Sequence, residues 1–538
     1  MTKYAVPGLI LLLACSIRSM SGAGQHEHTT VESARVGRVQ FSNSCSPAVK
    51  DKFNQAVATL HSFGYRKAGQ LFEAVALEDP SCGIAEWGVA MSHYRQLWDP
   101  PTPADVSAGL GAVERGRRMG SKTQRERDYL SAIEIIYGGS GKTSHRTRAA
   151  AYQTAMEALT ARYPEDREAA IFYALALIAN APASDKTYAA QKKASQILAP
   201  ILAEQPEHPG LAHYIIHADD HPVLASQALD AARRYARIAP DSPHALHMPS
   251  HIFTRLGMWD ESVESNLASA ASAQRQSLAG DQLHAMDYLV YAYLQTGRVS
   301  EAGKLVRELP PVHASDAAYY AGLYATAAIP ARYAIERHQW AEAAALTLPP
   351  DTFPGGPYVW TEANLYFARA LGAVRMGDVT AAQNAQKLLV SVRDTLLGAD
   401  DRYSADQAAI QLETISALIT FAQGARDSGL NQLRAAADHE DSTEITAVTP
   451  GPIVPVRELL GEILLQEKHA AGAFEAFESV LKVSPGRFRA LYGAAHSAEL
   501  AGLNEKAELY YRRLLNNCRQ ADSAVIEVVE AKKFQSRR

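Results

Sequence analysis

One sequence pattern recurs near both ends of this chain and predicts a pair of packed helices. In residues 53–80, small residues alternate with large aromatic ones and a proline ends the segment, at Ala56, Tyr65, Ala68, Phe72 and Pro80. Residues 459–485 repeat this order, at Gly461, Ala473, Phe477 and Pro485. Small residues let two helices approach, large residues fill the space between them, and proline ends the second helix. The pattern is typical of an antiparallel helix pair of about 34 residues.

Similar pairs can be laid end to end through most of the chain. Apolar residues follow the helical period of about 3.6 in six further segments, at 166–180, 187–206, 223–240, 282–302, 362–382 and 489–515. Between these segments, apolar and polar residues do not alternate convincingly in the way that predicts a β-strand. About twelve pairs fit, so the sequence predicts an all-α helical-repeat solenoid. A chain of 538 residues exceeds the usual single-core domain, which agrees with an elongated array.

The chain after residue 45 resembles the tetratricopeptide repeat (TPR) family. Four segments more narrowly resemble a group of exported bacterial TPR proteins, at residues 42–65, 79–92, 212–222 and 243–257. The resemblance implies a TPR-type solenoid and an exported location. It also implies that the first helix of each pair faces a concave groove in which ligands bind.

The first residues predict export. Lys3 precedes an apolar run from Ala5 to Ala14, which is too short to span a membrane and right for the core of a signal peptide. Two processing alternatives stay open, a lipid-anchored Cys15 or cleavage after Ala23. We therefore expect a protein of the periplasm, or one held at the bacterial envelope by lipid.

The repeats and their interruptions predict the organisation of the chain. Proline- and glycine-rich loops near residues 98, 137, 347 and 442 interrupt the stack without separating unrelated domains. We expect a signal peptide at 1–23, a flexible segment at 24–44, N-terminal repeats at 45–205, central histidine-rich repeats at 206–310, C-terminal repeats at 311–520 and a tail at 521–538.

Charge and cysteine usage limit the classes of function. The formal net charge of −5 gives no general attraction for nucleic acid or anionic lipid. Cys45 and Cys82 lie near the starts of two consecutive repeats, which favours a disulfide, whereas Cys518 has no partner. No CxxC, HExxH, GxSxG or P-loop motif occurs.

Eight of the 18 histidines lie between residues 208 and 284, and they share a register with the expected helix turns. Offsets of six, ten and thirteen residues recur before three turn positions. Counted back from Gly257, these positions are His251, His247 and His244. Counted back from Gly297, they are Tyr291, Asp287 and His284. Counted back from Val223, the first two offsets fall on His217 and His213. Three neighbouring helices could therefore bring these side chains together.

Steps of three and four residues place side chains on one face of a helix. Imidazoles with a carboxylate suit zinc, iron or copper ions and disfavour calcium or magnesium. We therefore expect a transition-metal site with ligands from His213, His217, His247, His251, His284 and Asp287. Residues expected to bind or orient a substrate are His244, Arg255, Tyr288 and Tyr291.

Pro249 leaves two interpretations of the central cluster open. A helix that starts at Pro243, capped by Ser242, contains Pro249 as an internal break. Alternatively the regular helix starts near Pro249, and His244 and His247 lie on its entry loop. The choice decides whether these two imidazoles point with His251.

Two functions of different classes fit this sequence. The first is an exported TPR protein whose histidine- and aspartate-rich groove binds a transition metal, with or without enzymatic turnover of a small-molecule substrate. The second is a metal-free scaffold that binds a protein or peptide partner in its groove. Neither interpretation involves nucleic acid, and contact with a membrane is expected only through a lipid anchor.

Overall fold

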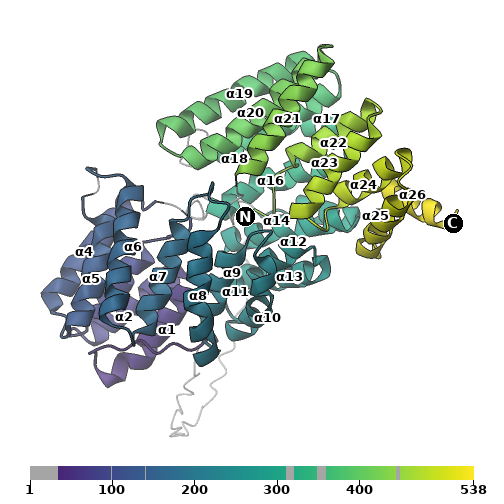
Figure 1. Cartoon of the computed structure of the whole chain (residues 1–538). Coiled ribbons are helices and arrows are strands. Elements are labelled where there is room, and N and C mark those ends of the chain that lie inside the picture. Colours follow the sequence, from purple (N-terminus) through teal and green to yellow (C-terminus); the bar gives the residue numbers. More distant parts are fainter. Residues whose placement is uncertain are drawn as a thin grey trace, which may run out of the picture. The chain divides into compact units, whose positions relative to one another are not determined.

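The computed structural model describes residues 34–98, 100–139, 141–310, 320–347, 359–443 and 449–537, and every regular element within these ranges is a helix. The expected signal peptide and most of the expected flexible segment lie outside them. None of the described helices combines the length and apolar character that a membrane-spanning helix needs. Most helices pack against the helix that follows them in the chain (Figure 1), so the all-α helical-repeat prediction is confirmed.

The N-terminal repeats are built from eight helices in which each packs against the next. Their bounds are α1 (Lys50–His61), α2 (Tyr65–Glu78), α3 (Ile84–Ser92), α4 (Pro103–Met119), α5 (Gln124–Tyr137), α6 (His145–Arg162), α7 (Arg167–Ala179) and α8 (Ala189–Glu204). Gly88 in α3 shows why small residues matter, because an added Cβ would lie 2.4 Å from the ring of Phe72. Cys45 and Cys82 form a disulfide that joins the chain before α1 to the chain before α3.

Residues 35–44 are packed, although a flexible segment was expected there. Val36, Val39 and Phe41 are buried, and the Phe41 ring lies 5.1 Å from that of Trp87. The Arg38 amide also donates to the carbonyl of Glu207. Three apolar residues in a polar stretch are enough to hold it against the helices.

The central repeats carry the histidine-rich region. Their helices are α9 (Pro209–Asp219), α10 (Leu229–Ile238), α11 (Pro243–His247), α12 (Pro249–Leu256), α13 (Trp259–Arg275), α14 (Ala279–Gln295) and α15 (Val299–Arg307), with a 3-10 turn η2 (Ala225–Ala228) before α10. Gly257 adopts φ 70° and ends α12, which is the conformation that glycine favours at a helix C-terminus.

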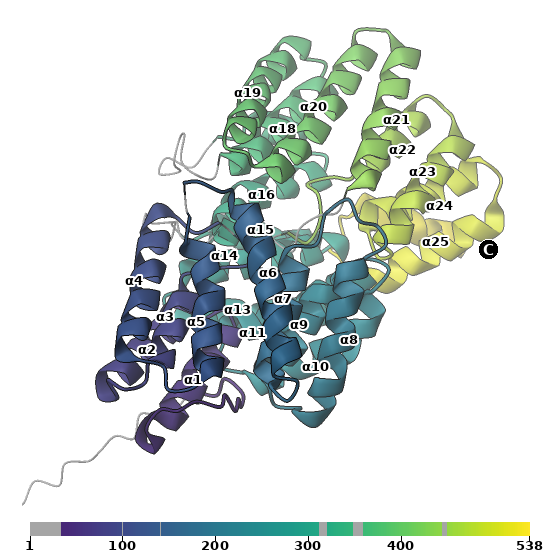
Figure 2. The same cartoon turned by 60° about the vertical axis from the view of Figure 1, so that its left-hand side comes forward.

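The C-terminal repeats continue the same packing, and α18 to α21 lie side by side in Figure 2. The helices are α16 (Tyr320–Glu336), α17 (Trp340–Ala344), α18 (Trp360–Arg375), α19 (Val379–Gly398), α20 (Arg402–Ala422), α21 (Arg426–Ser442), α22 (Val456–Gln466), α23 (Ala470–Val483), α24 (Phe488–Leu500), α25 (Asn504–Asn517) and α26 (Ile526–Ser536). The expected tail at 521–538 contains α26. Its Val528, Ala531 and Phe534 are buried with a helical spacing of three residues, so the segment is a packed helix.

Candidate metal centre

Six of the central histidines form two groups of three. The first histidine triad is His213 and His217 of α9 with His244 of α11. The second histidine triad is His247 of α11, His251 of α12 and His284 of α14. A step of four residues joins His213 to His217 and His247 to His251, so helix geometry alone places each of these pairs on one face.

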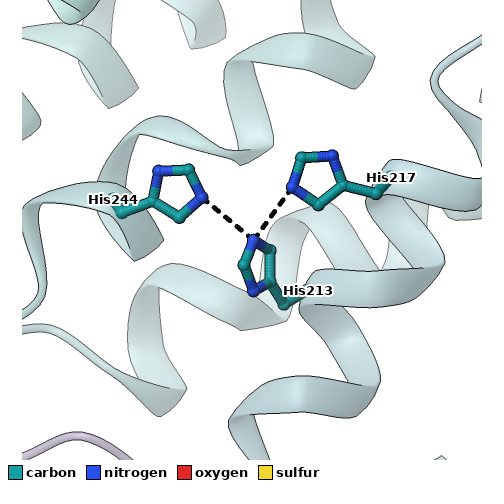
Figure 3. A group of neighbouring side chains, drawn as sticks. All are labelled: His213, His217 and His244. Atoms are coloured by element: carbon teal, nitrogen blue, oxygen red, sulfur yellow. Dashed lines mark hydrogen bonds between the residues drawn. The ribbon is translucent and has the colours of Figure 1, made fainter. Parts of the chain in front are cut away.

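The three imidazoles of the first triad converge through their Nε2 atoms (Figure 3). His213 Nε2 lies 3.0 Å from His244 Nε2 and 3.1 Å from His217 Nε2. The other nitrogen of His213, Nδ1, lies 2.6 Å from the backbone carbonyl oxygen of His61. A carbonyl only accepts, so Nδ1 of His213 carries the proton and its Nε2 presents a lone pair.

Burial keeps these imidazoles neutral. Each is at most 6% exposed. Desolvation, followed by the neighbouring imidazoles, lowers the pKa of His213, His217 and His244 well below the usual 6.5. A neutral imidazole has one N–H and one lone pair, and the lone pair of His213 Nε2 can accept one N–H, not two. Hydrogen bonding therefore cannot satisfy three Nε2 atoms at these distances.

The second triad is oriented by polar partners. His247 Nδ1 donates to Asn266 Oδ1 at 2.6 Å, and His251 Nδ1 donates to Asp220 Oδ2 at 2.9 Å. Asn266 uses its own amide group to donate to the carbonyl of Ser262, which fixes Oδ1 as the acceptor. The two Nε2 atoms then face each other at 2.9 Å. A carboxylate or amide behind an imidazole is the usual support of a histidine metal ligand.

Pro249 separates the two triads without ending the helical path. Ser242 caps α11, and Met248 between α11 and α12 keeps helical angles of φ −53° and ψ −36°. The chain therefore starts its helix at Pro243, and Pro249 only removes one backbone donor. On this short stretch His244 joins the first triad and His247 joins the second.

Two predicted residues lie away from the histidines. Asp287 pairs with Arg332 of α16, with Oδ1 3.4 Å from Nε, and Tyr291 accepts from Arg487 Nη1 at 3.3 Å. Helix α14 packs against both α13 and α16; Asp287 faces α16, whereas the Tyr291 ring lies between Trp259 of α13 and Arg332 of α16. Asp287, expected as a metal ligand, and Tyr291, expected to bind a substrate, therefore each have an arginine partner in the structure.

The other predicted residues contact the triads. Tyr288 Oη lies 3.3 Å from His251 Nδ1, and Arg255 Nε donates to Asp220 Oδ1 at 2.9 Å. Both therefore support the second triad through His251 or Asp220. His244, expected to bind substrate, is instead part of the first triad.

The histidines are buried, whereas the resemblance implied an open groove. Phe63, whose φ is 57°, lies with its ring 4.4 Å from that of His213 and 5.4 Å from that of His244. Trp98 lies edge-on to His217 at 6.0 Å. These two partly exposed aromatic side chains cover the first triad.

Several supporting residues escaped the sequence analysis. Asp220 lies three residues after His217, so a search for carboxylates near the histidines could have found it. Asn266 and the His61 carbonyl carry no such signal. His61 also belongs to a buried group in which Glu168 accepts from His61 Nε2 at 2.9 Å and from His208 Nε2 at 2.8 Å. Both ring nitrogens of His61 are hydrogen-bonded within this group, to Glu168 and to Tyr214, and the backbone carbonyl of His61 faces His213.

Asp220 provides a direct test of the second triad. In Asp220→Asn, we expect metal affinity at the second triad to fall about 10–100-fold, because the carboxylate no longer holds and polarises His251. Isothermal titration of zinc into the variant and the unmodified protein measures the change. Asp287→Asn is the matched variant and is expected to leave both affinities unchanged. Equal losses in the two variants would show that Asp220 does not support a ligand.

Comparison with known proteins does not assign this chain to a family. A search with the sequence finds no matching family model and no matching curated protein. Similar solved structures include the human IFIT1 dimer with m7Gppp-AAAA, at 12% identity over 88% of this chain and 100% of that chain, with a TM-score of 0.35. Another is the APC/C hetero-tetramer Cut9–Hcn1, at 11% identity over 90% of each chain, with a TM-score of 0.31. The helical-repeat fold is shown by the arrangement of the helices themselves.

Proposed function

We propose that this protein binds transition-metal ions through its two histidine triads, held in the centre of a TPR-like solenoid. The observation that carries the proposal is the convergence of three Nε2 atoms in the first triad. The imidazoles are neutral and buried, and one lone pair cannot accept two N–H groups. An ion bound to all three lone pairs removes this conflict.

The donor set supports the choice of ion. Three neutral imidazoles suit zinc, copper, iron(II) or nickel, whereas calcium and magnesium prefer oxygen ligands. Zinc–nitrogen bonds of about 2.0–2.1 Å in a tetrahedron separate the nitrogens by roughly 3.3 Å. The separations of 3.0 and 3.1 Å in the first triad need only a small opening to reach this value.

Export remains part of the proposal. The expected signal peptide and lipid-anchor cysteine lie outside the described residues. The disulfide between Cys45 and Cys82 supports an oxidising compartment, because disulfides persist outside the reducing cytosol. A protein in the periplasm or anchored to the envelope would have both the export signal and the oxidising surroundings that the disulfide needs.

Elemental analysis of the purified protein tests metal binding. After loading with zinc or copper and gel filtration, we expect about two ions per chain, one for each triad. The variant His217→Ala/His251→Ala removes one ligand from each triad and is expected to retain almost none. His469→Ala/His496→Ala is the matched control and is expected to retain both. Equal metal content in the two double variants would refute the proposal.

The pKa shifts predict when acid releases the metal. Because burial lowers the pKa values of His213, His217 and His244 well below 6.5, protons compete with the ion only below that pH. Metal content at the first triad should stay constant from pH 7.5 to 6.5 and fall at lower pH. Glu413 raises the pKa of His439 above 6.5, so metal bound there would leave at higher pH. Release beginning above pH 6.5 would contradict a buried triad.

A second candidate function is binding of a peptide partner. A cavity of about 50 Å³ lies among the C-terminal repeats and is lined by aromatic side chains, including Tyr324, Trp360 and Phe367. Glu440 lines the same cavity, and burial raises its pKa to about 8. Polar side chains such as Asn364 and Gln411 also line it, and because it is much smaller than a usual ligand pocket of about 300–1,000 Å³, a bound peptide side chain would have to widen it. Peptide binding here would survive removal of metal by a chelator, which separates it from the first function.

A further inference from the structure

The two histidine triads lie directly beside each other. The ring of His217 in the first triad lies 6.1 Å from that of His251 in the second, and the rings of His244 and His247 lie 6.3 Å apart. Within the first triad, the rings of His217 and His244 are 6.2 Å apart. The shortest of these ring distances between the triads, 6.1 Å, is therefore close to the longest ring distance within the first triad, 6.2 Å.

Electrostatics agrees with this closeness. His251 of the second triad lowers the pKa of His217 more than His244 of its own triad does. His284 is likewise affected by imidazoles of both triads, His247 first and His244 and His217 among the others. The six imidazoles therefore form one continuous cluster, and ions bound to the two triads would lie close to each other.

Each triad leaves its ion with room for another ligand. Zinc and copper ions take four or more ligands, so three imidazoles fill three positions and leave at least one open. Two ions close together commonly share a ligand between them. The size of such a ligand is limited, because all six histidines are at most 6% exposed and Phe63 covers the first triad.

We propose that the two triads form one dinuclear centre, in which a single small anion, such as hydroxide or azide, bridges the two ions. This inference rests on the proposed metal binding and adds that the ions act together. The class of ligand follows from the burial and from the charge of two cations held by neutral imidazoles. An anion between the ions offsets their mutual repulsion.

Copper titration followed by electron paramagnetic resonance tests the inference on the whole protein. With two copper(II) ions per chain, a bridged pair is spin-coupled, so the signal should fall below half of that expected for two isolated ions. Azide should then produce a new charge-transfer absorption band that saturates at one azide for each pair of coppers. Both readouts use the unmodified protein and do not depend on the folding of a variant.

Single-triad variants supply the reference spectra. His213→Ala and His284→Ala each lose one ligand from a different triad, and each is expected to bind one copper with its full uncoupled signal. If the protein with two coppers gives only the sum of these two spectra, and azide binds to each copper separately or not at all, the dinuclear centre is refuted while metal binding stands. If the unmodified protein binds no copper and no other transition metal, the proposed function itself fails.

Discussion

Adding zinc to the metal-free protein is expected to raise its free energy of unfolding by about 4 kcal/mol for each occupied triad, when free zinc is 1,000 times the Kd. The folded chain brings three buried imidazoles together at each triad, whereas the unfolded chain does not. Zinc bound at the proposed sites would therefore favour the folded state. In the metal-free state the lone pair of His213 Nε2 can accept an N–H from only one of its two neighbours, His217 and His244, so an ion bound to all three imidazoles would also remove this conflict.

Thermal unfolding at several zinc concentrations measures this gain. His213→Ala should lose about half of the zinc-dependent stabilisation, because only the second triad remains complete. His469→Ala, an exposed histidine in the C-terminal repeats, should retain all of it. A melting temperature that does not change with zinc, or an equal loss in both variants, would show that the triads do not bind the ion in the folded state.

The sequence predicted the parts of the site that depend on one helix. A spacing of four residues places His213 and His217 on one face of α9, and the same spacing joins His247 and His251. These pairs follow from helix geometry, whatever surrounds them. The small and large residues of the repeats predicted the helix pairs in the same local way.

The other contacts of the site depend on how different helices pack together. The spacing of residues along one helix does not determine that packing. His244 and His247 are three residues apart, yet they belong to different triads, because α11 lies between the histidines of α9 and those of α14. Asp287 shares a helix with His284 but turns towards Arg332. The partner of His213, the carbonyl of His61, is 152 residues away. Because every residue has a backbone carbonyl, the sequence does not single this one out.

A buried charge cluster connects α14 to the C-terminal repeats. The Arg487 guanidinium binds both oxygens of Glu458, at 2.6 and 2.7 Å, and lies 2.7 Å from a carboxylate oxygen of Glu336. It also donates to Tyr291 of α14, the helix that carries His284. Arg487 is only 1% exposed, so its charge is compensated by protein groups and not by water.

Arg487→Met is expected to lower the free energy of unfolding by about 3–5 kcal/mol at neutral pH, because it leaves two buried carboxylates without a cation. Burial already raises the pKa of Glu458, and loss of the guanidinium, which lowers it, raises it further. A carboxyl whose pKa is raised in the folded state stabilises that state at low pH and loses this contribution as pH rises. The loss of stability should therefore become smaller towards pH 5, and adding Glu458→Gln should restore part of the stability of the variant.

Arg402→Met removes an exposed partner of Asp400 and is expected to cost less than about 1 kcal/mol. Denaturant unfolding at pH 7.5 and 5 measures all four proteins, and equal stability of the two arginine variants would mean that the buried cluster does not hold α14 to the C-terminal repeats.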